Sequence, residues 1–214
     1  MIKLVLWDWN GTLLDDVRQS LECVNRLLRR RNMSEITLEQ YYSYVDTPIE
    51  KFYEHLFDMS TVDFTEIAKA YHQDYDAQSD SLSLNDGATE VLEYFSAHGV
   101  KQTIVSAAHR DMIDNVIDKF GIKHYFDSIL SSDDLNAGSK IDRARHYFAQ
   151  ANVLPDETLF IGDTLHDLET AESLGVKCIL TTKGHQSIKQ FPVDVQVVNN
   201  LNEIIPLSIG TTAI

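Results

Sequence analysis

Short apolar runs alternate with stretches of helical periodicity through most of this 214-residue chain. The runs that predict β-strands occupy residues 3–7, 102–105, 128–130, 158–161, 177–180 and 195–198. Strands that alternate with helices are typical of an α/β protein, in which helices flank a parallel sheet. We expect the last run to be an edge strand. The pattern therefore predicts a Rossmann-like α/β core.

Residues 16–85 break this alternation, because their apolar positions follow helical spacing and no run among them has the character of a strand. The first helix of this segment would place four aliphatic side chains on one face, namely Val17, Leu21, Val24 and Leu28. We therefore predict a small α-helical domain at 16–85, inserted into an α/β core made of residues 1–15 and 86–214.

Two further helices are expected inside the inserted domain. The stretch Thr47-Pro48-Ile49-Glu50 combines a capping box with proline at the first helical position, which predicts the start of a helix. One face of that helix would carry Ile49, Phe52, Tyr53 and Leu56, and one face of the next would carry Phe64, Ile67, Tyr71 and Tyr75. These faces are expected to form the core of the domain.

The charge of the chain limits its partners. Lysine and arginine number 18 against 33 aspartates and glutamates, which gives a formal net charge of −15. Nucleic acids and anionic membrane surfaces are bound by basic patches, so neither is expected as a partner. A small anionic substrate would be repelled by the overall field, so its site must supply local positive charge. The sequence leaves open whether the chain acts as a monomer or a homodimer.

The cysteines and the hydropathy indicate in which cellular compartment the protein is expected. Cys23 and Cys178 lie far apart and form no CxxC motif, so we expect two reduced core thiols. No apolar run approaches the roughly 18 residues that a membrane span requires. A cytoplasmic, soluble protein is therefore expected.

Reactive side chains stand where the predicted strands end. Asp8 follows the first strand, Ser106 the second and Asp163 the fourth, and Lys140 opens a helix shortly after the third. Because α/β sheets bind ligands at the carboxyl ends of their strands, these four segments are expected to meet at one edge.

These segments resemble the motifs of one family. The loop Asp8-Trp9-Asn10-Gly11-Thr12 resembles the signature of the haloacid dehalogenase superfamily, and Ser106, Lys140 and the Gly162-Asp163 segment with Asp167 match its other three motifs in order. An insertion between the first and second motifs corresponds to the helical cap subclass, to which phosphoglycolate phosphatase belongs. The resemblance implies a magnesium-dependent phosphatase that acts on a small phosphorylated metabolite, such as phosphoglycolate or a sugar phosphate.

The resemblance also implies roles for the site residues. Asp8 would attack phosphorus and form an aspartyl-phosphate that water then hydrolyses. Oxygen ligands suit Mg²⁺, and the expected metal ligands are Asp8, the backbone carbonyl of Asn10, Asp163 and Asp167. Donors to the phosphoryl group, which must offset its negative charge, would come from Gly11, Thr12, Ser106, Ala107 and Lys140. The catalytic residues would be Asp8, Asn10, Thr12, Ser106 and Lys140.

Each motif has a simpler interpretation when taken alone. Asp163 and Asp167 stand at the start of a helix, where acids commonly act as caps. The loop from Asp8 could be a polar turn, and Ser106 could cap the helix near Arg110. Lys140 is harder to explain in this way, because a cation in the first helical turn is disfavoured by about 0.3–1 kcal/mol when exposed. A bound anion would offset that cost.

One position departs from the family pattern. Phosphatases of this family use the second aspartate of the signature as general acid and base, and this chain has Asn10, which cannot exchange a proton near neutral pH. Two alternatives follow. Phosphonoacetaldehyde hydrolase also lacks that acid and forms a Schiff base with a cap lysine, for which Lys51 is the counterpart to consider here. The chain could also be a weakly catalytic member that binds a phosphorylated ligand.

Overall fold

The computed structural model describes residues 1–132 and 139–209 and contains a six-stranded parallel sheet with the order β5-β4-β1-β6-β7-β8. The strands are β1 (Leu4–Trp7), β4 (Lys101–Val105), β5 (Ser128–Leu130), β6 (Thr158–Gly162), β7 (Lys177–Thr181) and β8 (Gln196–Val198). All six predicted strands are confirmed, and β8 lies at an edge as expected. The α/β class is therefore confirmed.

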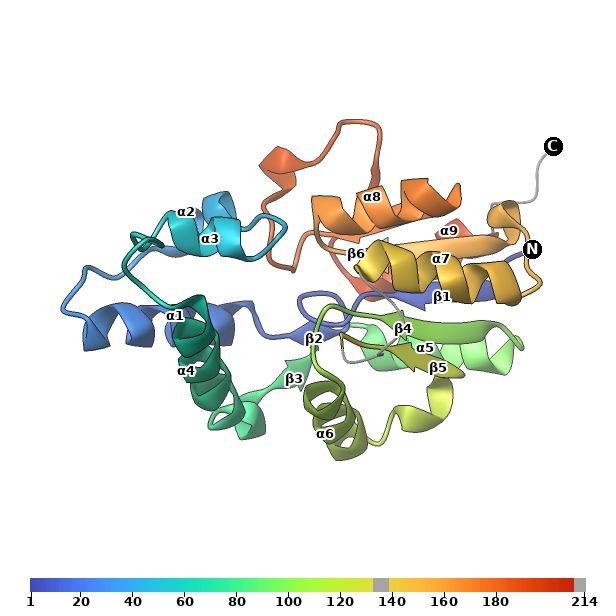
Figure 1. The fold of residues 1–214 in the computed structure, drawn as a ribbon. Coiled ribbons are helices and arrows are strands. Elements are labelled where there is room, and N and C mark those ends of the chain that lie inside the picture. The colour runs from blue at the N-terminus through green and yellow to red at the C-terminus, as the bar shows by residue number, and fades with distance from the viewer. Residues whose placement is uncertain (133–138, 210–214) are drawn as a thin grey trace.

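Helices cover both faces of the sheet (Figure 1). Because side chains alternate along a strand, Val5 and Trp7 of β1 face one layer and Leu4 and Leu6 face the other. The first layer contains α5 (Ala88–Ala97), α6 (Arg110–Phe120) and α9 (Ile204–Ile209), and the second contains α7 (Lys140–Gln150) and α8 (Leu165–Leu174). Both faces of the central strands are thus buried, which explains their continuous apolar runs.

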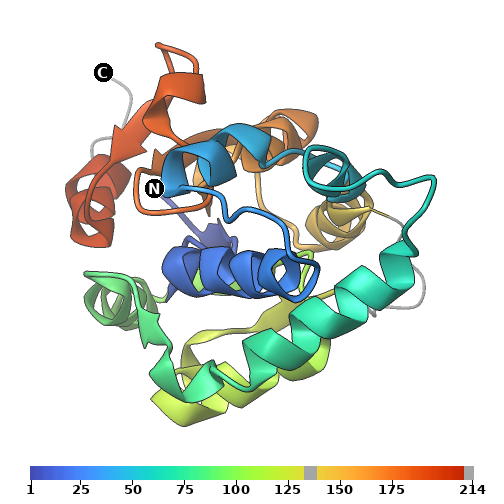
Figure 2. The same cartoon turned by 90° about the vertical axis from the view of Figure 1, so that its left-hand side faces the viewer.

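Four helices from the predicted inserted domain lie together beside the carboxyl edge of the sheet (Figures 1 and 2). They are α1 (Val17–Arg30), α2 (Leu38–Tyr44), α3 (Glu50–Glu54) and α4 (Phe64–Asp76). Their buried side chains form a separate apolar cluster, which includes Leu27, Phe52, Tyr53 and Ile67. The aromatic side chains of this segment therefore pack mainly in a core. We call residues 16–85 the cap, and its exact boundaries stay a prediction.

Two expectations for the cap were wrong. The segment contains a short strand, β3 (Ser83–Leu84), which pairs antiparallel with β2 (Leu14–Asp15) at the junction with the core. Two-residue strands are too short to leave an alternating pattern, so periodicity missed both. The third helix begins at Glu50 without a side-chain cap, and Ile49 precedes it and is 51% exposed. Thr47 therefore does not cap a helix, and Ile49 does not share the buried face.

Short 3₁₀ turns complete the described chain, at Ser79–Ser81, Lys123–Tyr125, Pro155–Glu157, Ile188–Gln190 and Leu201–Glu203. Cys23 and Cys178 are buried free thiols, as predicted. Within residues 1–132 and 139–209, none of the helices has the length and apolar character that crossing a membrane requires.

Candidate active site

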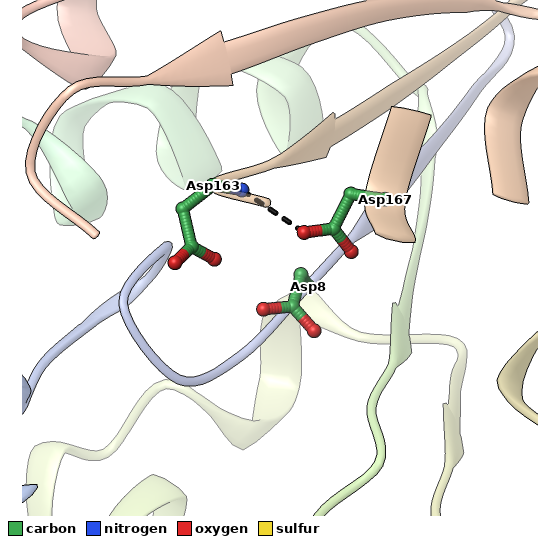
Figure 3. Close-up of side chains that lie close together, drawn as sticks. All are labelled: Asp8, Asp163 and Asp167. Carbon is green, nitrogen blue, oxygen red and sulfur yellow. Dashed lines mark hydrogen bonds between the residues drawn. The ribbon is translucent and has the colours of Figure 1, made fainter. Parts of the chain in front are cut away.

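The sheet brings the first and fourth predicted motifs together. β1 and β6 are parallel neighbours in which Trp7 pairs with Ile161, so Asp8 and Asp163 follow their strands at the same edge. The amide of Asp8 also donates to the carbonyl of Ile161, at 2.8 Å. Asp167 joins them from the first turn of α8, and one carboxylate oxygen of each residue lies within 4.8 Å of the others (Figure 3). The three carboxylates therefore converge, although Asp8 is more than 150 residues away from the other two in the chain.

Lys140 completes this cluster from the start of α7. A capping box between Ser139 and Asp142 fixes the helix start. The ammonium of Lys140 contacts Asp8 Oδ1 and lies 2.6 Å from Asp167 Oδ1, and its side chain is only 5% exposed. The two carboxylates supply the negative charge that this cation requires at a helix N-terminus.

Asp167 serves both as a helix cap and as a site residue. Its Oδ2 accepts hydrogen bonds from the amides of Asp163 and Thr164, at 3.1 and 2.9 Å, and from the Thr164 hydroxyl, at 2.7 Å. Its Oδ1 binds Lys140. Because both oxygens already have protein donors, Asp167 holds Lys140 and the segment at Asp163 in place. Direct contact of Asp167 with a metal ion stays a prediction.

Burial dominates the electrostatics of the cluster. It raises the pKa of Asp8 well above its ordinary value, and Asp167 and Asp163 add to the rise while Lys140 opposes it. Burial also raises the pKa of Asp163. For Asp167, the effect of burial is outweighed by Lys140 and the Thr164 donors, so its pKa is lowered. The pKa of Lys140 is raised, because the attraction of its carboxylate partners outweighs the effect of its own burial.

The donor set fits a hard divalent cation. Three buried carboxylates converge here and one lysine pairs with two of them, so the cluster carries more negative charge than Lys140 compensates. Oxygen ligands at this spacing suit Mg²⁺ or a similar ion, which would supply the missing positive charge. Of the three carboxylates, Asp8 and Asp163 are the better candidates for ligands, since Asp167 is satisfied by Lys140 and its own turn.

The signature loop is held by a residue that sequence reasoning did not select. Asp16 is buried and accepts hydrogen bonds from the Asn10 amide group and the Gly11 backbone amide, both at 2.8 Å, and from the Tyr75 hydroxyl, at 2.8 Å. It also faces the ring of His185, with Nε2 3.0 Å from Asp16 Oδ1. The carboxylate beside the loop is therefore on residue 16, and Asn10 donates to it.

Two glycines allow this loop to approach the cluster. A Cβ on Gly11 would lie 2.4 Å from Asp163 Oδ2 and 2.5 Å from a carbon of the His185 ring, and its φ of +72° also favours glycine. A Cβ on Gly184 would lie 2.1 Å from Asp163 Oδ2. Both positions therefore exclude a side chain.

Several predicted phosphate donors are engaged within the chain. The Thr12 hydroxyl donates its proton to Asp163 Oδ1 at 2.8 Å, and the Gly11 amide donates to Asp16. Ser106 lies at the end of β4, beside β1, and its hydroxyl accepts from the amide of Ala108 at 3.0 Å. It supports that turn and does not cap α6. Contacts of Gly11, Thr12, Ser106 and Ala107 with a phosphate stay predictions.

His185 and Asp16 are the site residues that the motif comparison missed. His185 follows β7, and the rule that reactive residues stand at strand ends also applies to this strand. The adjacent acids Asp15 and Asp16 gave no sequence signal for choosing between them, since both are acidic residues just before the helical pattern that begins at Val17. Lys51, in contrast, pairs with Asp46 at 3.3 Å and is about half exposed on the cap.

Comparisons with known proteins identify the family of the chain. The family model of haloacid dehalogenase-like hydrolases matches residues 5–181. A phosphoglycolate phosphatase from Pseudomonas putida is 26% identical, covering 95% of this chain and 79% of the relative. The tyrosine-protein kinase PtkA from Mycobacterium tuberculosis is 27% identical, covering 86% of this chain and 63% of the relative.

Solved structures confirm the fold. The crystal structure of a predicted phosphatase from Clostridium acetobutylicum superposes with a TM-score of 0.82 and 22% identity, covering 98% of this chain and 99% of that one. The similarity therefore includes the cap as well as the sheet. Because the family model spans most of the sequence, the chain belongs to the haloacid dehalogenase-like hydrolases, and it is a phosphatase of the phosphoglycolate phosphatase-like kind.

Proposed function

We propose that the protein hydrolyses a small phosphate monoester in a magnesium-dependent reaction, with Asp8 as the nucleophile. The observation that carries this proposal is the convergence of Asp8, Asp163 and Asp167 around Lys140 at the carboxyl edge of the sheet. A phosphoryl group repels a carboxylate nucleophile, so catalysis requires fixed positive charge at this place.

The proposed reaction has two chemical steps. An oxygen of Asp8 attacks phosphorus, the bond to the leaving-group oxygen breaks, and an aspartyl-phosphate forms. Lys140 holds Asp8 in position and offsets charge on the phosphoryl oxygens, and Thr12 holds Asp163. Water then attacks the phosphorus of the aspartyl-phosphate, which releases inorganic phosphate and regenerates Asp8.

A divalent cation, held by Asp8 and Asp163 with the Asn10 carbonyl, would supply the remaining positive charge at the phosphoryl group. No acid of the signature is available to protonate the leaving group, since position 10 is an amide that is hydrogen-bonded to Asp16. Substrates whose leaving group needs no proton should therefore react fastest, because general acid help is worth about 10²–10⁴-fold.

The substrate proposal comes from the relatives. Phosphoglycolate phosphatases of several Pseudomonas species match nearly the whole chain, which favours phosphoglycolate, with a small sugar phosphate as the alternative. The two buried free thiols are compatible with action in the cytoplasm, where such metabolites are found. Cleavage of a carbon–phosphorus bond through Lys51 gains no support, because that lysine pairs with Asp46 on the cap.

Hydrolysis of an activated aryl phosphate with Mg²⁺ tests the proposal. Wild-type protein should turn over, and Asp8→Asn should lose nearly all activity. Asp156→Asn is the matched control, because that carboxylate is exposed on the 3₁₀ turn before β6 and far along the strand from the site.

A wild-type protein that hydrolyses no monoester across a broad metabolite panel, yet binds inorganic phosphate, would refute the proposal. That result would favour the weakly catalytic, ligand-binding alternative, which the amide at position 10 already suggests.

A further inference from the structure

The segment between β7 and β8 links the cap to the core. This segment, residues 182–195, rises toward α2 and α3 (Figure 1). Three of its residues contact α2 or Val45, the residue that follows α2. Lys189 lies 3.8 Å from Glu39, His185 Nδ1 lies 2.8 Å from the Tyr41 hydroxyl, and the Gln186 amide donates to the Val45 carbonyl at 3.0 Å. The first contact is exposed, whereas the other two are largely buried.

His185 joins this contact to the carboxylate cluster. Its backbone amide donates to Asp163 Oδ2 at 2.6 Å, while its ring lies between Tyr41 and Asp16. Both ring nitrogens therefore have partners, so the ring is not free to contact a substrate. The residue instead connects a cap tyrosine to a carboxylate that we propose as a metal ligand.

Gln186 repeats the same arrangement one residue later. Its Nε2 donates to the cap at Val45, and its Oε1 accepts from the amide of Leu165, the first residue of α8, at 2.6 Å. Two successive residues thus each have one hydrogen bond to α2 or the residue after it and one to the segment 163–165. A Cβ on Gly184, just before them, would lie 2.1 Å from Asp163 Oδ2, so the backbone of this segment runs close to that carboxylate.

We propose that His185 and Gln186 are positioning residues that make the placement of Asp163 depend on the position of α2. If α2 moves away, Tyr41 and the Val45 carbonyl leave together, and the segment that holds Asp163 loses its cap contacts. The inference rests on the proposed function in one respect, namely that Asp163 holds the divalent cation. It predicts that the cap influences metal binding even when no substrate is present.

Tyr41→Phe is the direct test, because it removes the hydroxyl that faces His185 and keeps the ring, which packs 5.4 Å from Phe52. The measurement is calorimetric titration of metal-free protein with Mn²⁺ alone. We expect the dissociation constant to rise roughly threefold to tenfold, at or below the low end of the roughly 10–100-fold loss for residues that orient metal ligands. Excess metal should then restore the turnover of this variant.

Tyr53→Phe is the matched control, since Tyr53 is buried in the same apolar cluster and its ring packs against Phe52. Its Mn²⁺ affinity should equal that of the wild type. Gln186→Asn is the second variant, because the shorter side chain cannot reach both Val45 and Leu165, and it should weaken Mn²⁺ binding in the same way. It gives a result even if Tyr41→Phe fails to fold.

Coupling between two sites is reciprocal, so Mn²⁺ should also slow amide hydrogen exchange in α2 of the wild type. Normal Mn²⁺ binding by both Tyr41→Phe and Gln186→Asn would overturn this proposal alone and leave the proposed function standing. Failure of the wild-type protein to bind Mn²⁺ or Mg²⁺ would overturn both.

Discussion

Asn10 donates a hydrogen bond to Asp16, with 2.8 Å between Asn10 Nδ2 and Asp16 Oδ2. The family signature has a carboxylate at the position of Asn10, and here the carboxylate is six residues further along the chain. This hydrogen bond explains why position 10 carries an amide and not a carboxylate. Asp16 is buried and also accepts hydrogen bonds from Gly11, Tyr75 and His185. A second carboxylate at position 10 would face it directly.

Asn10→Asp should therefore destabilise the protein by roughly 1–3 kcal/mol, because two carboxylates in contact must share a proton or separate. The double variant Asn10→Asp with Asp16→Asn exchanges the two groups and keeps one donor and one acceptor. Near about pH 10, where His185 is neutral and its ion pair with Asp16 no longer contributes, it should recover most of the lost stability in urea unfolding. It should also hydrolyse an alkyl phosphate roughly tenfold or more faster than the wild type, since an acid then lies in the signature loop.

Asp16→Asn alone is the control for this exchange, and it should not gain activity on the alkyl phosphate. If the double variant is no more stable than Asn10→Asp, the contact with Asp16 is not the reason that position 10 carries an amide. Equal rates for the double variant and the wild type would mean that the proton comes from elsewhere.

Much of the fold and part of the site could be predicted because the signals are local. The buried central strands leave continuous apolar runs, and Asp8 and Asp163 follow two of those runs directly. Their convergence then follows from the pairing of adjacent parallel strands. Lys140 could be placed at the start of α7, because the residue before it, Ser139, is of a type that caps helix N-termini.

The rest depends on contacts between distant segments. Asp16 is the first residue of the predicted cap, where an acid commonly caps a helix, but its carboxylate makes no helix-capping hydrogen bond and binds the signature loop. His185 is 169 residues away from its partner Asp16. Nothing in the local sequence at either residue indicates this pairing, which arises only when the segment after β7 folds over the edge of the sheet.

Replacing Lys140 by methionine tests the charge balance of the cluster. The variant leaves Asp8 and Asp167 buried without their cation, and breaking a buried ion pair in this way costs about 3–5 kcal/mol. Because Mg²⁺ can replace the missing positive charge, saturating Mg²⁺ should raise the unfolding free energy of the variant by more than that of the wild type. Urea unfolding with and without Mg²⁺ measures both quantities.

Lys177→Met is the matched control for Lys140→Met, since Lys177 is exposed at the start of β7. Its stability should change little and should respond to Mg²⁺ as the wild type does. A Lys140→Met variant that is as stable as this control would show that the carboxylates are not a charged cluster in solution.

Gly184→Ala should weaken metal binding by roughly tenfold, because the added methyl group would lie 2.1 Å from Asp163 Oδ2 and must displace that carboxylate. The steric conflict should also cost roughly 1–3 kcal/mol of stability. Gly99→Ala provides a comparison, since its φ of +69° also makes alanine costly but no atom lies within 4 Å of the added Cβ. Calorimetric Mg²⁺ titration of both variants distinguishes displacement of Asp163 from a general loss of stability, and unchanged Mg²⁺ affinity in Gly184→Ala would contradict the role of Asp163 as a ligand.

The pairing of His185 with Asp16 should make the stability of the metal-free protein depend on pH. Burial opposes the charged imidazolium, but Asp16 outweighs it and raises the pKa of His185 from 6.5 to about 9. A base whose pKa is raised on folding stabilises the folded state fully below pH 6.5, and this contribution is lost as the pH rises through about 9. The shift corresponds to roughly 3 kcal/mol at most.

Urea unfolding of metal-free protein from about pH 6 to about pH 10 should therefore show a falling free energy of unfolding across this window. In Asp16→Asn the fall should be much smaller, because the amide introduced at position 16 gives no charge to hold the proton on His185. The same variant separates this effect from the ionisation of other groups, since it leaves His185 and its contacts with Tyr41 and Asp163 in place. A decline of equal size in both proteins would mean that the ion pair does not form in solution, and His185 would then connect cap and core as a neutral ring.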